Sequence, residues 1–99
     1  METQVSKQVF YKDADASFEY EEFGASVLLH CEVLRWTPSI VKKGYMVLGD
    51  FMNTMRKQGF KRLVTVTPNP KFAKLFGGKT ENAFIYEGKE HEVVVWDLN

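Results

Sequence analysis

Three consecutive segments in the middle of the chain decide its fold: VLLHCEVL at residues 27–34, SIVKKGYMVLGDFMNTMRKQ at residues 39–58, and LVTV at residues 63–66. The first and third are short apolar runs rich in β-branched residues, which is typical of buried strands. The middle segment repeats apolar residues at helical spacing. A strand, a helix and a second strand in this order predict a right-handed βαβ crossover with two parallel strands.

The helix over residues 39–58 is predicted by an apolar stripe with suitable residues at both ends. Thr37 can cap its first turn, Pro38 suits the first helical position, and Gly59 supplies a left-handed end. Gly44 and Gly49 are unusual inside a helix, since each costs about 1 kcal/mol relative to Ala. We therefore expect close backbone approach at Gly44 or Gly49, either to the sheet or to a ligand, with the sheet favoured. The stripe consists of Val41, Tyr45, Leu48, Met52 and Met55, widened by Ile40, Val47 and Phe51.

The remaining elements follow from alternation and turn residues. Asn69 is expected to cap a short helix that ends at Gly77-Gly78. The expected strands cover residues 3–11, 16–23, 27–36, 61–67, 82–87 and 91–97. This β(β)β-α-β-α-ββ order predicts a mixed α/β fold with a single twisted sheet, in one domain of residues 1–99.

Composition limits the class of protein. The chain has 99 residues, of which 44% are apolar and 14% aromatic, as expected of a small soluble domain. No apolar run approaches the roughly 20 residues of a membrane span, so we expect no membrane partner. The polar start predicts no secretory signal peptide. A single cysteine, Cys31, excludes an intrachain disulfide framework and fits a reducing, cytoplasmic setting.

Charge is segregated along the chain although the net charge is zero. Residues 1–40 hold three basic and seven acidic groups, residues 41–79 nine and one, and residues 80–99 one and five, giving −4, +8 and −4. The basic block predicts either an anion site for phosphates or nucleic acid, or a solvated helix face that pairs with acidic strands. The zero sum favours the second interpretation, so we do not expect nucleic acid as the main partner.

Five residues are candidates for chemistry. His30 and Glu32 are two apart in an expected strand and therefore share a face. They can form a general base and its orienter, or simply a partly exposed sheet face. Lys42, Lys43 and Gly44 form a candidate anion-binding turn near the start of the helix, with ordinary first-turn residues as the alternative. The sequence contains neither a metal-ligand spacing nor a Walker-type glycine loop.

The element order over residues 26–97 resembles the C-terminal half of the GNAT fold, the family of acyl-CoA-dependent N-acetyltransferases. Residues 69–78, NPKFAKLFGG, are the most telling local match. They also resemble a segment of short GNAT-like proteins from T7-like tailed bacteriophages. The resemblance implies acetyl-CoA as cofactor, catalytic Glu32 with His30, and cofactor contacts that comprise Lys42, Lys43, Gly44, Tyr45 and Asn69.

Three departures from the family pattern stand beside this resemblance. The family's pyrophosphate loop has Gln or Arg, then Gly three positions later, then Gly or Ala two further on. Here the stretch is Val41, Gly44 and Met46, so only Gly44 matches. The family's general-acid Tyr corresponds to Phe76, which has no proton to donate. Residues 1–25 have no room for the N-terminal helices that usually build the acceptor site.

Three functions follow from these observations. The first is a catalytically degenerate GNAT-like module that binds a partner or has a structural role, such as a bacteriophage virion or host-interaction protein. The second is a minimal acyltransferase that binds acetyl-CoA at residues 42–46 and uses Glu32 through water. The third is a nucleic-acid-binding domain. Under all three, a homodimer or another protein partner is expected to bury an edge strand and an open sheet face.

Overall fold

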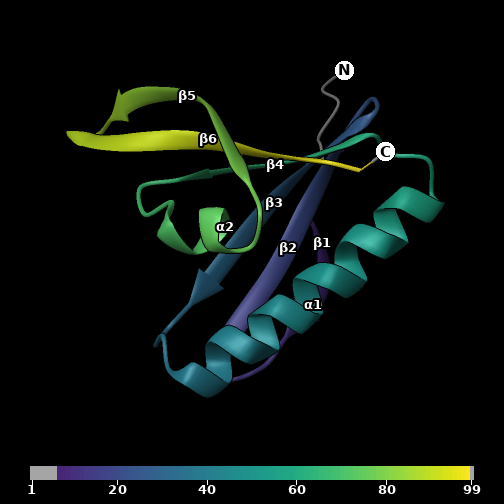
Figure 1. Cartoon of the computed structure of the whole chain (residues 1–99), viewed down its shortest axis with the longest axis horizontal. Helices are drawn as coiled ribbons and strands as arrows, with labels where there is room; N and C mark the ends of the chain where they lie inside the picture. The colour runs from purple at the N-terminus through teal and green to yellow at the C-terminus, as the bar shows by residue number, and fades with distance from the viewer. Residues whose placement is uncertain (1–6, 99) are drawn as a thin grey trace.

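The computed structural model describes residues 7–98, which form one six-stranded mixed sheet and two helices (Figure 1). The sheet order is β1-β2-β3-β4-β6-β5, with β3 and β4 parallel and every other pair antiparallel. The mixed α/β class and the βαβ crossover are therefore confirmed. The elements are β1 Gln8–Lys12, β2 Ala16–Phe23, β3 Ser26–Val33, α1 Pro38–Lys57, β4 Arg62–Thr67, α2 Lys71–Leu75, β5 Lys79–Tyr86 and β6 Lys89–Asp97.

The ends of α1 agree with the predicted signals. Thr37 Oγ1 accepts a hydrogen bond from Ile40 N at 3.2 Å, and Gly59 has a φ of +94°. The face that α1 buries is rotated from the predicted stripe, because Ile40, Leu48, Phe51 and Met55 are buried whereas Tyr45 is 64% exposed. Apolar side chains occupy a wide arc of this helix, so their spacing alone leaves the centre of the buried face undecided.

The prediction that α1 approaches the sheet closely at Gly44 or Gly49 is wrong. A Cβ added at Gly49 would meet no atom within 4 Å, and one at Gly44 would make only an ordinary contact of 3.9 Å with Phe76. The crowded glycine is Gly78, after α2. Its added Cβ would lie 2.4 Å from Val94 Cγ1 and 2.9 Å from the Ala73 carbonyl oxygen. The glycine that packing requires therefore lies where a loop crosses β6.

Several element boundaries also differ from the expectation. The first expected strand begins in residues 3–6, which lie outside the described residues, and β1 starts at Gln8. Strand β3 ends at Val33 rather than at residue 36. Leu34 N still donates to Asp15 O at 2.9 Å, next to the last β2–β3 pair, and the chain then turns toward α1. Asn69 does not cap α2. Its own N–H donates to Thr67 Oγ1 at 3.0 Å, and α2 begins after Pro70 without a side-chain cap.

The hydrophobic core lies between the two helices and one face of the sheet (Figure 1). Phe51 of α1 contacts Phe10 and Tyr20 edge to face, with ring centroids 5.0 and 5.2 Å apart. Within residues 7–98, both helices lie on this one face. The main core residues are Phe18, Tyr20, Val27, Leu29, Leu48, Phe51, Met55, Leu63, Ala73, Val94, Trp96 and Leu98.

Candidate functional site

The central feature of the site is the separation of the two parallel strands. β3 and β4 pair from Ser26–Arg62 to Leu29–Thr65, yet β3 continues to Val33 and β4 to Thr67. The unpaired ends form an opening at the carboxyl edge of both strands, beside the N-terminus of α1. Ligands of open α/β sheets bind outside this edge. We call the opening the slot.

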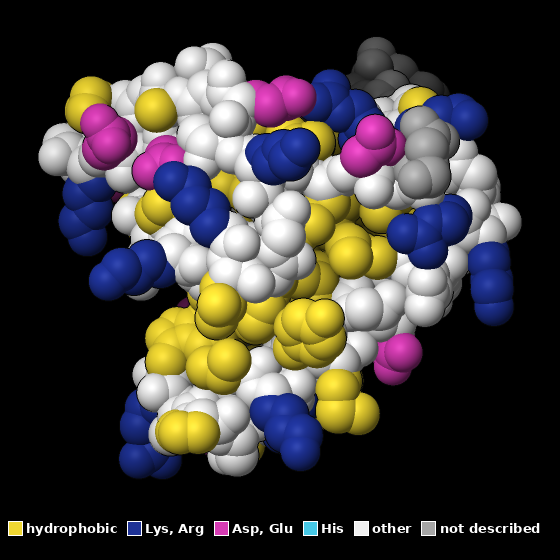
Figure 2. Space-filling view, viewed as in Figure 1, with side chains coloured by type: hydrophobic (Ala, Val, Ile, Leu, Met, Phe, Trp, Pro, Cys, Tyr) yellow, Lys and Arg dark blue, Asp and Glu magenta, His cyan; other side chains and the backbone are white. Residues whose placement is uncertain are grey.

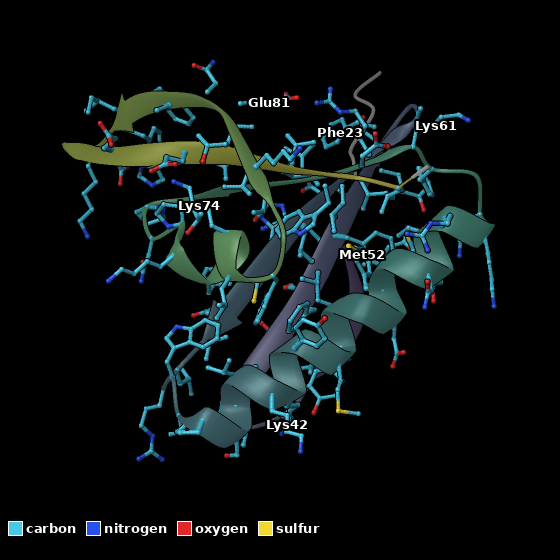
Figure 3. All side chains as sticks on the ribbon, viewed as in Figure 1. Phe23, Lys42, Met52, Lys61, Lys74 and Glu81 are labelled. Carbon is cyan, nitrogen blue, oxygen red and sulfur yellow. The ribbon has the colours of Figure 1, made fainter. Side chains whose placement is uncertain are left out.

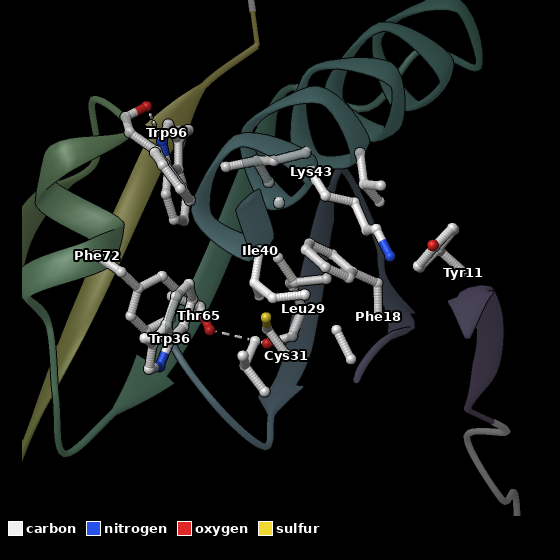
Figure 4. A pocket seen from close by; sticks show the side chains of 16 residues that line it. Tyr11, Phe18, Leu29, Cys31, Trp36, Ile40, Lys43, Thr65, Phe72 and Trp96 are labelled. Carbon is white, nitrogen blue, oxygen red and sulfur yellow. Dashed lines mark hydrogen bonds between the residues drawn. The ribbon is translucent and has the colours of Figure 1, made fainter. Parts of the chain in front are cut away.

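The slot is filled by the chain's own side chains (Figure 4). Trp36 lies on Phe72, with ring centroids 5.0 Å apart, and Phe72 contacts Phe76 at 6.3 Å. Thr65 Oγ1 donates to Leu29 O at 2.9 Å across the two strands. The remaining free volume is about 10 Å³, which is room for about one water molecule. In this conformation the slot cannot hold a cofactor arm.

A polar groove of about 370 Å³ lies on the other side of the sheet and holds both candidate catalytic residues, His30 and Glu32. The slot and this groove share Cys31, Thr65 and Phe72 as lining residues, so they are opposite sides of the same strand separation. His30 Nε2 is buried and has no hydrogen-bond partner among the described residues, its nearest carboxylate being Glu21 at 3.6 Å. The structure therefore brings His30 and Glu32 together, as their spacing predicted.

Lys43 is engaged within the chain. Its Nζ lies 2.6 Å from Asp13 Oδ2, and the Tyr11 hydroxyl donates to the same carboxylate oxygen. The hydrogen bond from Lys43, followed by that from Tyr11, holds the pKa of Asp13 well below its usual range. The hydrogen bond to Asp13 in turn raises the pKa of Lys43. Lys42 is exposed on the outer side of α1, away from α2 (Figure 3). Neither lysine thus points into the slot as a free cation.

Gly44 and Tyr45 lie inside α1 rather than at its start. The helix begins at Pro38, and Val41 N already donates to Thr37 O at 2.9 Å. Only the first N–H groups of a helix are free to bind an anion, so the backbone around Gly44 is not a phosphate cradle. Tyr45 is exposed and contacts the edge of Phe76, with ring centroids 5.6 Å apart.

Asn69 lines an apolar groove of about 460 Å³ at the mouth of the slot, together with Trp36, Val41 and Phe72. Trp36 and Phe72 are the residues that sequence reasoning missed as part of the site. The signal was present, because each is a large aromatic next to a helix start. The pairing of the two rings, however, depends on how the helices are placed on the sheet.

Basic side chains surround this mouth. Figure 2 shows apolar side chains gathered between α2 and the N-terminal half of α1, with Lys and Arg around them. Among residues 7–98, three of the nine basic residues of the basic block form ion pairs with acidic residues from outside it: Lys43–Asp13, Arg62–Glu81 and Lys74–Glu92. Only Lys74–Glu92 joins a helix to an acidic strand residue, since Asp13 lies in the turn between β1 and β2 and Arg62 belongs to β4. Exposed pairs contribute little to stability, about 0–1 kcal/mol each.

Cys31 is not activated as a nucleophile. Burial raises the pKa of its thiol to about 11, so the group is protonated at neutral pH. No cluster of three His, Cys, Asp or Glu side chains suited to a metal ion occurs within the part of the chain that the structure describes. For residues 7–98, no helix combines the length and the apolar content that crossing a membrane requires.

Comparison with known proteins finds solved structures of the same fold but no match to the sequence itself. No family model and no curated protein matches the sequence. Solved structures do match. One of them is aminoglycoside 6'-acetyltransferase type Ii, which matches at a TM-score of 0.74 and 11% identity over 90% of this chain and 66% of that one. An acetyltransferase from Bacillus cereus matches at 0.68 and 12%, over 95% of this chain and 73% of that one.

The ribosomal-protein-S18-alanine N-acetyltransferase from Escherichia coli matches at a TM-score of 0.63 and 12% identity, over 85% of this chain and 61% of that one. The chain thus spans about two thirds or less of the aminoglycoside enzyme and of the Escherichia coli enzyme. The matched structures are GNAT acetyltransferases, and this chain has a GNAT-like fold. At such identities the likeness concerns the fold alone.

Proposed function

We propose that this chain is a catalytically degenerate GNAT-like module that acts by binding or assembly rather than by acyl transfer. One observation carries the proposal: Trp36, Phe72 and Phe76 fill the strand separation and leave about 10 Å³. Acyl transfer needs a thioester held within reach of a base, and the closed slot offers no room for one.

Two further features support this proposal. Phe76 stands where the family has its general-acid Tyr and has no proton for a leaving thiolate. Lys43 is held by Asp13, so it does not supply a free charge for a pyrophosphate. Acetyl-CoA, the cofactor that the fold suggests, therefore meets neither an open channel nor a ready anion site. The bacteriophage virion or host-interaction setting rests on the resemblance of residues 69–78 alone.

Calorimetric titration with acetyl-CoA, with free CoA as a control, tests the proposal. We expect no heat of binding up to millimolar ligand and no acyl transfer to a panel of amines. Binding in the micromolar range, which corresponds to about −8 kcal/mol, would refute a closed slot.

Variants sharpen this test. Phe72→Ala removes the ring on which Trp36 lies and is expected to open the slot. If closure by this aromatic pair is what excludes the ligand, Phe72→Ala gains measurable affinity for acetyl-CoA. Tyr86→Ala, which removes an exposed ring on the β5–β6 hairpin, is the matched control and is expected to show no binding of acetyl-CoA. If neither variant binds acetyl-CoA and the wild-type protein transfers no acyl group, the anion site is lost as well.

A second candidate, a minimal acyltransferase, is favoured by the polar groove. His30, whose Nε2 makes no hydrogen bond among the described residues and lies 3.6 Å from Glu21, and Glu32 line this groove directly behind the slot. Were Trp36 and Phe72 to move, a thioester in the slot would face both side chains through the strand separation. In that case Glu32 would accept the amine proton through water, and Glu32→Gln would lower kcat without changing acetyl-CoA affinity.

A further inference from the structure

The outer edge of the sheet at β5 is free. β5 is the last strand in the sheet order and, within residues 7–98, pairs only with β6 (Figure 1). All eight of its residues are exposed, among them Phe84 at 41%, Ile85 at 67% and Tyr86 at 57%. An exposed edge strand presents unpaired N–H and C=O groups, and natural proteins usually protect such an edge with charges, proline or a bulge.

The part of β5 that lacks such protection is residues 82–86, NAFIY. This segment contains no charged residue, proline or glycine, and three of its five residues favour strands. The irregularity in the β5–β6 register lies just before it, between Thr80 and Asn82, and the turn at residues 87 and 88 ends it. The opposite edge strand, β1, has only five residues and an irregular register with β2. Of the two edges, β5 is therefore the one suited to strand pairing.

The hairpin turn fixes which backbone groups of this segment are free. Residues 87 and 88, whose φ values are +51° and +77°, form a two-residue loop between Tyr86 and Lys89. Such a loop is closed by a hydrogen-bonded pair, and hydrogen-bonded and non-hydrogen-bonded pairs then alternate along the two strands. The even-numbered residues of the segment therefore bond to β6, and the N–H and C=O groups of Ala83 and Ile85 point outward.

We propose that β5 pairs antiparallel with β5 of a second copy, about a twofold axis that is perpendicular to the sheet and passes beside Phe84. The uncharged segment extends two residues on either side of Phe84, so it is its own partner under such an axis. Ala83 then pairs with the second copy's Ile85 through their outward groups, and the equivalent pair forms on the other side of the axis. Asn82 lies opposite the second copy's Tyr86. The two sheets join into one continuous sheet.

The aromatic side chains of the hairpin favour a second copy in this register. Phe84 lies directly opposite His91 and stacks on it, with ring centroids 5.9 Å apart. Tyr86 meets the same imidazole edge-on at 5.7 Å. The twofold axis places two of these clusters side by side and brings the two Phe84 rings together. Aromatic pairs across neighbouring strands stabilise a sheet, so the contact gains from being formed with an identical strand.

Charges at the ends of the segment limit the strength of this pairing. Glu81 and Glu87 flank the segment, so each comes opposite the other's equivalent in the second copy. Glu81 is ion-paired with Arg62, which offsets the repulsion. A register centred on Ala83 would avoid this contact, but it would carry the irregularity that precedes the segment into the interface. Pairing over five residues is smaller than a standard interface of about 800 Å² per partner, so we expect a dimer that dissociates on dilution. This inference does not depend on whether the slot binds acyl-CoA.

Sedimentation velocity of the full chain from micromolar to millimolar concentration tests the dimer, with circular dichroism to verify that each variant is folded. Wild-type protein is expected to shift from monomer to dimer across this range. Ile85→Pro removes an outward N–H and leaves the bonds to β6 intact, so it weakens the dimer by at least about tenfold. Ile85→Ala, which keeps this N–H, weakens the dimer far less. A wild-type monomer at every concentration overturns the proposal, as does an Ile85→Pro variant that dimerises like the wild type.

Disulfide cross-linking tests the register and does not depend on the folding of Ile85→Pro. Phe84→Cys places two thiols on the twofold axis, where the Cα atoms of a non-hydrogen-bonded pair lie about 4.5 Å apart, within reach of a disulfide. With oxidised glutathione as the oxidant, this variant is expected to form a covalent dimer. Tyr86→Cys, an equal change on the same face of β5, lies about 14 Å from its own equivalent and remains monomeric.

The wild-type chain, whose Cys31 is partly buried, measures background cross-linking under the same conditions. Ala83→Cys distinguishes the alternative register, because it lies on the axis only if the pairing is centred on Ala83. Phe84→Cys that cross-links no more than Tyr86→Cys overturns the proposed pairing. Ala83→Cys that cross-links in place of Phe84→Cys overturns it as well.

Discussion

Substitution of Gly78 by alanine tests how closely α2 and the following loop pack on β6. The added Cβ would lie 2.4 Å from Val94 Cγ1, 2.9 Å from the Ala73 carbonyl oxygen and 3.0 Å from Trp96 Cε2, whereas ordinary contacts begin near 3.4 Å. The Ala73 oxygen cannot move freely, because it belongs to α2 and accepts the Gly78 N–H at 2.9 Å. Relief therefore requires α2 or β6 to shift.

Overpacking of a core typically costs 1–3 kcal/mol, and two of the three crowded atoms are buried side chains while the third is backbone. We expect Gly78→Ala to lower the free energy of unfolding by about 3 kcal/mol, which lowers the midpoint of thermal unfolding by roughly 12–24 °C for a domain of this size. Gly49→Ala is the matched control. Its Cβ meets no atom within 4 Å, so it should stabilise α1 by about 0.5–1 kcal/mol.

Urea unfolding of the two variants at one protein concentration, followed by circular dichroism and tryptophan fluorescence, measures both changes. The substitutions are chemically identical, so effects on the unfolded chain largely cancel in the comparison. A loss smaller than about 0.5 kcal/mol for Gly78→Ala would refute the tight crossing of α2 over β6. An unchanged m value would show that the difference arises in the folded state.

The remaining predictions concern single contacts. Asp13 has a pKa held below its usual value of 3.8, first by Lys43, so its stabilising contribution is present above that value and is lost as the pH falls below it. Asp13→Asn should therefore lower the melting temperature more near neutral pH than near about pH 3, and equal losses would contradict this. Cys31, whose thiol pKa is raised to about 11 by burial, should be alkylated slowly in the folded protein and rapidly in urea; equal rates would contradict the burial. Thr37→Ala should cost about 1 kcal/mol by removing the cap on Ile40 N, measured by urea unfolding against Ser39→Ala.

Local pattern was enough to predict the fold class and the ends of α1. The caps at Thr37 and Gly59 act over a single turn, so residues next to each other in sequence determine them. The shared face of His30 and Glu32 follows from the two-residue period of a strand in the same way. The departures at Met46 and Phe76 were also visible in the sequence, and they motivated the expectation of a degenerate site.

Tertiary structure decided what local pattern leaves open. The wide apolar arc of α1 suits more than one orientation, and packing of Phe51 against Phe10 and Tyr20 selected the buried face. Closure of the slot depends on Trp36 meeting Phe72, two rings that only the placement of both helices on the sheet brings together. The capture of Lys43 by Asp13 likewise joins segments far apart in the chain. Periodicity and caps are short-range properties that a sequence displays directly, whereas the shape of a site is set by long-range contacts that exist only after the sheet and helices have packed.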